Sequence, residues 1–238
     1  MKYDILIDIG NTFAKVAFVM EGKIIEEKSV VSTDLSIFLN DIFETRGKAG
    51  VIAVSDVRKN VEILGRPAEE CCEKFIKLDS GSSMPLKIDY NTPETLGADR
   101  IAAAIGAHAI FPNDNCLIFD FGTAITVDIV NSNGVYEGGN ISPGMDMRFR
   151  AMHEFTGKLP LIEAVDIKGI IGKNTEEAIN NGVVLGIIFE IERYKENYPE
   201  HKIIFTGGDA IFFAKKLKFT IFVVYNLFLR GLMKVAEF

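Results

Sequence analysis

Two short segments of this chain combine an aspartate, a glycine and a threonine at the spacing of a tight turn between strands. The first reads Asp8-Ile9-Gly10-Asn11-Thr12, the second reads Asp120-Phe121-Gly122-Thr123, and an apolar run ends at each aspartate. A glycine-bearing turn exposes backbone N–H groups that can surround phosphate oxygens, and a threonine adds a hydroxyl donor. The two segments together therefore indicate a phosphate-binding site.

Charge decides what else such a site needs. Lys15 could neutralise a phosphate from the first segment, whereas Asp8 and Asp120 repel phosphate, so a cation must intervene if they share the site. One aspartate on Mg²⁺ together with substrate phosphates is ordinary kinase chemistry. The alternative for either segment alone is a tight turn without function, and the presence of two copies favours the site. Neither a P-loop nor a Gly-x-Gly-x-x-Gly fingerprint follows a strand.

The predicted strands and helices that position these segments occur in the same order in both halves of the chain. Hydrophobic periodicity in the first half predicts strands at 3–8, 14–20 and 23–30, a helix at 33–46 and a strand at 49–55. A mostly helical stretch is predicted at 57–75, and a helical region from Thr92 to residue 110 with a break at Gly97.

The second half repeats this order with additions. It has predicted strands at 115–120, 124–130, 134–141, 202–206 and 219–225, a loop at 138–144, and helices at 145–155, from Thr175, after residue 209 and from Asn226. We therefore expect an α/β protein of two similar halves, residues 1–114 and 115–238, packed directly with a cleft between them.

Composition excludes several classes of protein. The 238 residues are 48% hydrophobic and 25% charged, as in ordinary globular proteins, and the net charge of −7 argues against nucleic-acid and membrane-surface partners. No signal peptide or bilayer-spanning apolar stretch is recognisable. Three cysteines, Cys71, Cys72 and Cys116, suit neither a disulfide framework nor a paired metal motif. We expect a reduced, cytoplasmic protein.

Five segments, in order, resemble a known family. Asp8–Lys15, Asp120–Ala124 and Thr206–Asp209 look like the phosphate loops and adenosine-side glycines of the acetate and sugar kinase/Hsp70/actin superfamily. Tyr90–Arg100 and Gly138–Gly144 resemble the type III pantothenate kinases within it. The resemblance spans nearly the whole chain. It implies two ribonuclease H-like halves of the actin-like ATPase fold, with mixed sheets flanked by helices.

The resemblance also implies an activity. This is the ATP-dependent phosphorylation of pantothenate to 4'-phosphopantothenate, the first step of coenzyme A biosynthesis, by a homodimer with a shared active site that uses Mg²⁺ and K⁺ or NH₄⁺. By position, Asp99 corresponds to the general base, Asp120 to the monovalent-cation ligand and Asp8 to a Mg²⁺ partner acting through water. The ATP-binding positions are Asp8, Ile9, Gly10, Asn11, Thr12, Phe13, Ala14, Lys15 and Thr123. The pantothenate-binding positions are Tyr90, Gly97, Ala98, Asp99, Arg100 and Thr175.

Some positions keep alternative interpretations. Without the family, Asp99 and Arg100 would be a helix-start acid and a surface base, and Thr175 would be the N-cap of its helix rather than a contact from a neighbouring subunit. Gly182 and Gly186 would let that helix approach a second copy closely.

Two alternative functions remain open: another small-molecule kinase or ATPase on the same fold, and an accessory transcriptional regulator. The segment Tyr90–Arg100 argues against the first. Retention of Asp8, Asp99, Arg100 and Asp120, together with the acidic net charge, argues against the second.

Overall fold

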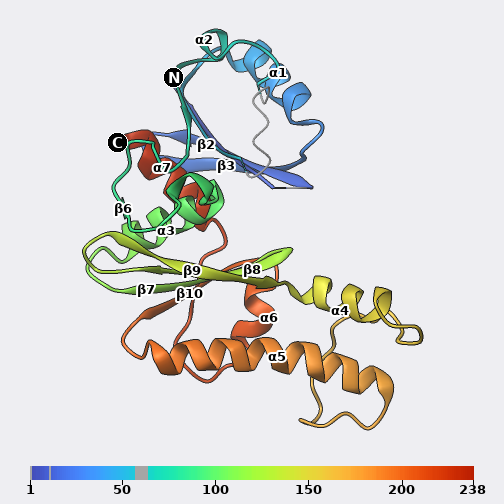
Figure 1. The fold of residues 1–238 in the computed structure, drawn as a ribbon. Coiled ribbons are helices and arrows are strands. Elements are labelled where there is room, and N and C mark those ends of the chain that lie inside the picture. Colours follow the sequence, from blue (N-terminus) through green and yellow to red (C-terminus); the bar gives the residue numbers. More distant parts are fainter. Residues whose placement is uncertain (1, 11, 57–63) are drawn as a thin grey trace. The chain divides into compact units, whose positions relative to one another are not determined.

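The computed structural model describes residues 2–10, 12–56 and 64–238, which fold into two compact units (Figure 1). The first unit contains Met1–Asn113, Val130–Glu137 and Asn226–Phe238, and the second contains Asp114–Ile129 and Gly138–Tyr225. A boundary of two repeated halves between residues 114 and 115 stays a prediction, as does the cleft between those halves.

A five-stranded mixed sheet forms the centre of the first unit. Its spatial order is β3-β2-β1-β4-β5, where β2 runs antiparallel to β1, and β4 runs parallel to both β1 and β5. The strands are β1 (Asp4–Ile9), β2 (Phe13–Met20), β3 (Lys23–Val31), β4 (Ala49–Asp56) and β5 (Cys72–Lys77). Because β1 is central and apolar on both faces, helices must cover both sides of this sheet.

The two faces of this sheet are covered by different helices. Ile5, Ile7 and Ile9 alternate along β1 and pack in one core with Leu39 of α1 (Leu35–Arg46). The opposite face, which carries Leu6, contacts the helix pair α3 (Ala98–Ile110) and α7 (Leu227–Glu237). The two ends of the chain therefore meet in one unit, with α7 against β1 and β4.

Helices α3 and α7 lie side by side because glycines bring their backbones into contact (Figure 1). A Cβ atom added to Gly231 would overlap the carbonyl oxygen of Ala102, and one added to Gly106 would overlap that of Leu227. No side chain larger than hydrogen fits at either position, so the spacing of the two helices is set by backbone contact.

The second sheet repeats the order of the first. Its order is β11-β10-β7-β8-β9-β6, and β10 runs parallel to both β7 and β11. The strands are β7 (Cys116–Phe121), β8 (Ala124–Val130), β9 (Val135–Pro143), β10 (Lys202–Gly207) and β11 (Phe222–Val223). The short β6 (Lys87–Ile88) pairs with Val135 and Tyr136 of the first unit.

An aromatic core lies on one face of the second sheet. Phe119, Phe121, Phe205 and Phe213 contact one another, with ring centroids 4.8 to 6.1 Å apart. The helices that pack in this core are α4 (Met145–Glu154), α5 (Thr175–Asn197) and α6 (Ala210–Ala214). Figure 1 shows α5 as the long helix of this unit.

The repeated α/β order predicted from the sequence is confirmed, since two mixed sheets with the same strand order are each flanked by helices. The break at Gly97 is also confirmed, because a short 3₁₀ turn (Pro93–Thr95) precedes α3.

Two local predictions were wrong. Part of the stretch predicted as helix, 57–75, lies outside the described residues, and the rest holds only the short α2 (Ala68–Cys71) before β5. Pairing with the buried strand β4 outweighed the helical preference there. The predicted loop at 138–144 instead continues β9 to Pro143, since Gly138 adopts a φ of 110° within the strand.

The contact between α3 and α7 generates a stability prediction. Gly231→Ala should lower the free energy of unfolding by about 1–3 kcal/mol, because the new methyl group overlaps the Ala102 backbone and the helices must separate. Urea denaturation measures this change. Gly157→Ala is the control, since a Cβ there has no atom within 4 Å, and equal stability of the two variants would contradict the packing argument.

Candidate functional site

Asp8 lies at the end of the central strand of the first unit, between two polar neighbours. It pairs in register with Lys15 on β2 and with Ser55 on β4. The pKa of Asp8 is raised to about 6, first by burial and then by the charge of Asp99, while Lys15 and the Ser55 hydroxyl lower it. The structure therefore brings two of the predicted carboxylates, Asp8 and Asp99, together within one unit.

The segment after Asp8 forms a closed hairpin end. Gly10 N–H donates to the carbonyl oxygen of Phe13 at 3.0 Å, and a Cβ at Gly10 would lie 3.0 Å from that oxygen. Ser32 ties the segment to β3, since its hydroxyl donates to Gly10 O at 3.0 Å and its N–H to Thr12 O at 2.9 Å. The Thr12 and Lys15 side chains are exposed, and both can donate hydrogen bonds to a phosphate. Asn11, also predicted at the ATP site, lies outside the described residues.

Asp99 occupies the first turn of α3. Gly97 is the N-cap residue, and the Asp99 Oδ1 accepts a hydrogen bond from Arg100 N–H at 2.9 Å. A Cβ at Gly97 would overlap the Asp99 carboxylate, so a larger residue there would shift that side chain. The carboxylate is thus held at the N-terminal end of α3.

Arg100 lies inside the first unit with two tyrosines. Its side chain is 6% exposed, and its guanidinium lies 5.9 Å from the Tyr136 ring centroid. The rings of Tyr90 and Tyr136 pack edge to face, with their centroids 6.2 Å apart. The alternative in which Arg100 is a surface base is therefore wrong. Tyr136 was not predicted from the sequence, because only the pairing of β9 with β6 brings it to this cluster.

Asp120 in the second unit is surrounded by closely approaching backbone. Gly207, at a φ of 89°, comes so close that a Cβ there would lie 2.5 Å from Asp120 Oδ1. Gly144 N–H donates to Thr123 O at 3.0 Å, and a Cβ at Gly144 would overlap the carbonyl oxygens of Gly122 and Thr123. Glycine is therefore required where three segments converge on the turn after β7.

Several oxygens lie at this turn: Gly207 is close to Asp120 Oδ1 and Phe121 O, and Gly144 is close to the carbonyl oxygens of Gly122 and Thr123. One carboxylate and the backbone carbonyls of 121–123 are hard ligands, which suit K⁺ or Mg²⁺ rather than a thiophilic metal. Within the described parts of the chain, no group of three His, Cys, Asp or Glu side chains could hold a metal ion. A cation here would accordingly need carbonyl or substrate oxygens as further ligands.

A second acidic pair lies near the glycines that follow β10. Burial and the charge of Asp146 raise the pKa of Asp209. Asp146 is in the first turn of α4, directly after Gly144. The predicted adenosine-side segment is thus acidic, which favours contact with sugar or base groups over contact with phosphate.

Thr175 begins α5 but does not cap it. Asn174 is the N-cap, since its side-chain oxygen accepts from Glu177 N–H at 2.9 Å, and Glu177 Oε2 in turn accepts from Lys173 N–H at 2.7 Å. The alternative in which Thr175 is the N-cap is therefore wrong by one residue. The Thr175 side chain is exposed on its own chain.

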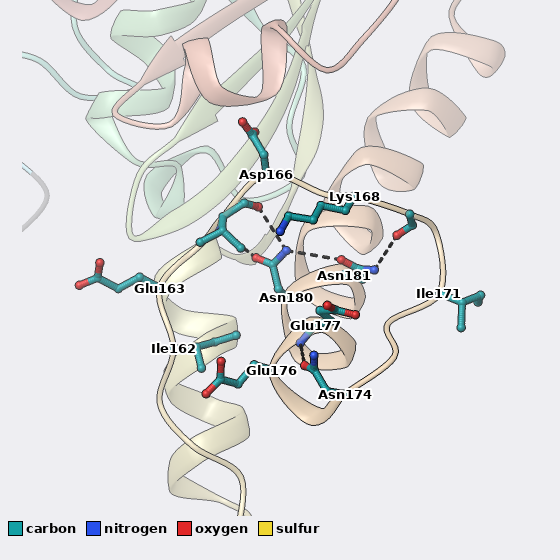
Figure 2. A pocket seen from close by; sticks show the side chains of 12 residues that line it. Ile162, Glu163, Asp166, Lys168, Ile171, Asn174, Glu176, Glu177, Asn180 and Asn181 are labelled. Atoms are coloured by element: carbon teal, nitrogen blue, oxygen red, sulfur yellow. Dashed lines mark hydrogen bonds between the residues drawn. The ribbon is translucent and has the colours of Figure 1, made fainter.

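A pocket in the second unit lies beside this helix, not at the predicted site (Figure 2). The Asn180 side chain pairs with both the N–H and the carbonyl of Val165, at 3.0 and 3.2 Å, and Asn181 donates to Gly169 O at 2.7 Å. Several acidic side chains line the pocket, which does not suit a phosphate: Glu163, Asp166, Glu176 and Glu177.

The predicted residues thus fall into two groups. The first unit assembles Asp8, Lys15, Asp99, Arg100 and Tyr90, and the second unit holds Asp120, Thr123 and Thr175. Sequence reasoning missed Ser32 and Ser55, whose only signal was a serine at the end of a predicted strand. No described helix has the length and apolar character needed to cross a membrane.

Comparisons with known proteins identify the family to which this chain is similar. A model of the family described as type III pantothenate kinase matches residues 5–197. Relatives named type III pantothenate kinase include one from Bacteroides fragilis, 42% identical over 99% of this chain and 98% of its own, and one from Cytophaga hutchinsonii, 39% identical over 99% of both chains.

Solved structures show the same fold at lower identity. A Campylobacter jejuni protein described as a candidate Baf family transcriptional activator has a TM-score of 0.64 at 24% identity, over 98% of this chain and 97% of its own. A glucokinase from an Antarctic psychrotroph has a TM-score of 0.52 at 12% identity, over 100% and 99%. These likenesses concern the fold alone, whereas the family model and the full-length relatives go further: the chain belongs to the type III pantothenate kinase family.

Proposed function

We propose that this protein transfers the terminal phosphoryl group of ATP to the hydroxyl group of pantothenate. The observation that carries the proposal is that two carboxylates of the first unit lie close enough to interact electrostatically, Asp99 at the start of α3 and Asp8 at the end of β1. A base for an acceptor hydroxyl beside a carboxylate for phosphate-bound metal is what phosphoryl transfer requires. Membership of the type III pantothenate kinase family supports pantothenate as the acceptor.

The residues divide the work as follows. Asp99 accepts the proton of the pantothenate hydroxyl as that oxygen attacks, and the Arg100 guanidinium and Tyr90 orient the acceptor. Gly97 and Ala98 contact pantothenate next to Asp99. The hairpin Asp8–Lys15 and Thr123 bind the phosphates of ATP. Mg²⁺, bound through water at Asp8, and K⁺ or NH₄⁺ at Asp120 supply positive charge to the phosphate oxygens when they are present.

The role of Asp99 is open to a direct test. Asp99→Asn should retain the fold but lower kcat for pantothenate phosphorylation by at least about 10²-fold, because the amide cannot accept the hydroxyl proton. Steady-state assays should compare pantothenate with a panel of sugars and short hydroxy acids. Glu94→Gln, an exposed change in the preceding 3₁₀ turn, should keep the wild-type rate. Near-normal turnover of Asp99→Asn would remove this residue from the role of base.

The cation proposal concerns Asp120. Activity should require K⁺ or NH₄⁺, and Asp120→Ala should abolish this dependence together with most of the activity, since the proposed cation site would lose its charged ligand. Rates are measured in matched K⁺, NH₄⁺ and Na⁺ salts. Glu200→Ala, at an exposed position, should leave the dependence unchanged. Full activity of the wild type in Na⁺ alone would contradict the assignment.

The proposal includes a homodimer with a shared site, and exposed apolar side chains of the second unit support it. Among the described residues of that unit they include Ile141, Phe155, Leu161, Val165, Ile170, Ile171 and Phe189. Exposed apolar side chains favour a protein partner, and a second copy would also cover the exposed Thr175. A Cβ at Gly182 on α5 has no atom of this chain within 4 Å, which leaves room for another backbone.

Association can be tested on α5. Gly182→Glu should convert a dimer into a monomer in sedimentation experiments and lower pantothenate kinase activity, because the carboxylate would be buried in the contact and Thr175 would lose its partner site. Ser83→Glu, an exposed change of equal charge in the first unit, serves as the control. A wild-type monomer, or an unchanged dimer in Gly182→Glu, would refute the interface.

A further inference from the structure

Each sheet places a buried hydroxyl directly beside the aspartate at the end of its central strand. Asp8 of β1 pairs in register with Ser55 of the parallel strand β4, and Asp120 of β7 pairs with Thr206 of the parallel strand β10. The same arrangement therefore occurs once in each unit, on strands that occupy the same place in the sheet order.

The two hydroxyls point to the face that carries the aspartates. In β4, Ile52 and Val54 pack in the core with α1, so the alternation of side chains puts Ser55 on the opposite face, as it does Asp8 in β1. In β10, Phe205 packs in the aromatic core, so Thr206 lies on the opposite face. Each hydroxyl thus shares a sheet face with the carboxylate of its register partner.

Neither hydroxyl is explained by packing alone. Ser55 and Thr206 are both fully buried, at 0% exposure, and among the described residues neither side-chain oxygen completes a hydrogen bond of standard geometry. Burying a hydroxyl without a partner is unfavourable, and alanine or valine would fill the same space without that penalty. A polar group kept in such a place needs a partner that it reaches after a small adjustment.

The available partner is the neighbouring carboxylate in both cases. Ser55 is the register partner of Asp8 on the adjacent parallel strand, and the two side chains lie on the same face of the sheet. In the second unit, Gly207 directly follows Thr206 and lies so near Asp120 that an added Cβ would be 2.5 Å from its Oδ1. The end of β10 therefore runs along the Asp120 carboxylate.

We propose that Ser55 and Thr206 are positioning residues that donate hydrogen bonds to the carboxylates of Asp8 and Asp120 and hold each in the orientation that receives a cation. This inference rests on the proposed function, which gives the two carboxylates their cations. The donated hydrogen bond occupies one carboxylate oxygen and leaves the other oxygen for the cation. Neither hydroxyl touches substrate.

The experiment compares a variant that lacks the hydroxyl with one that retains it. Thr206→Val keeps the shape but removes the donor, while Thr206→Ser keeps the donor and removes a methyl group. Thermal stability of the purified protein is measured over a K⁺ titration, with Na⁺ as the reference salt. The K⁺ concentration for the half-maximal shift should rise about tenfold in Thr206→Val and stay near the wild-type value in Thr206→Ser, as expected for a lost hydrogen bond to a charged group.

Ser55 is tested by metal-dependent nucleotide binding. Ser55→Ala should weaken calorimetric binding of Mg²⁺-ADP about tenfold but leave binding of ADP in EDTA unchanged, because only the metal depends on the Asp8 orientation. Ser83→Ala, in an exposed loop, is the matched control. In the kinase assay, Ser55→Ala should raise KM for Mg²⁺-ATP more than it lowers kcat.

The outcomes separate this inference from the proposed function. Equal K⁺ responses of Thr206→Val and Thr206→Ser, or unchanged Mg²⁺-ADP binding in Ser55→Ala, would overturn the inference while wild-type activity upholds the function. The expected binding changes in a protein that phosphorylates no pantothenate would support the inference and overturn the function. A wild type that responds to neither K⁺ nor Mg²⁺-ADP would overturn both.

Discussion

The first unit depends on the close contact between α3 and α7. Gly106 and Gly231 let the two helix backbones touch, and α7 in turn packs on β1 and β4. This contact fixes the height of α3 over the sheet, and with it the position of its first turn. Asp99 in that turn consequently comes close enough to Asp8 to raise its pKa. A packing constraint between helices thus decides the electrostatics of the candidate site.

The proximity of two carboxylates is unfavourable in the free protein. Burial and the Asp99 charge both oppose ionisation of Asp8, and the Lys15 ammonium offsets only part of this effect. A bound cation would remove the repulsion. Asp99 lies in the first turn of α3, whereas Asp8 lies within the sheet, so the two acids have different environments.

In the second unit, glycine backbone lies near the aspartate at the end of the central strand. Gly207 lets its backbone approach the Asp120 carboxylate, and Gly144 lets its backbone approach the carbonyl oxygens of Gly122 and Thr123. The two sheets thus surround their aspartates differently: Lys15 lies beside Asp8 in the first unit, whereas glycine backbone approaches Asp120 in the second.

The sequence by itself determined the repeated order of strands and helices, the two aspartate-glycine turns and the family. These follow from local periodicity and from residues close together in the chain, so no tertiary information was needed. Local reasoning failed for β5 and for the end of β9, where pairing with a neighbouring strand outweighed local preference. It also placed the cap of α5 one residue late, because Asn174 and Thr175 are both good caps.

Only the tertiary structure decided which distant residues meet. Register between parallel strands placed Ser55 beside Asp8 and Thr206 beside Asp120, and a sequence pattern does not contain that register. Burial of Arg100 against Tyr136 likewise depends on a strand pair formed by segments about fifty residues apart. The sequence therefore predicts the chemistry that a single residue can perform, whereas long-range packing determines which residues it contacts.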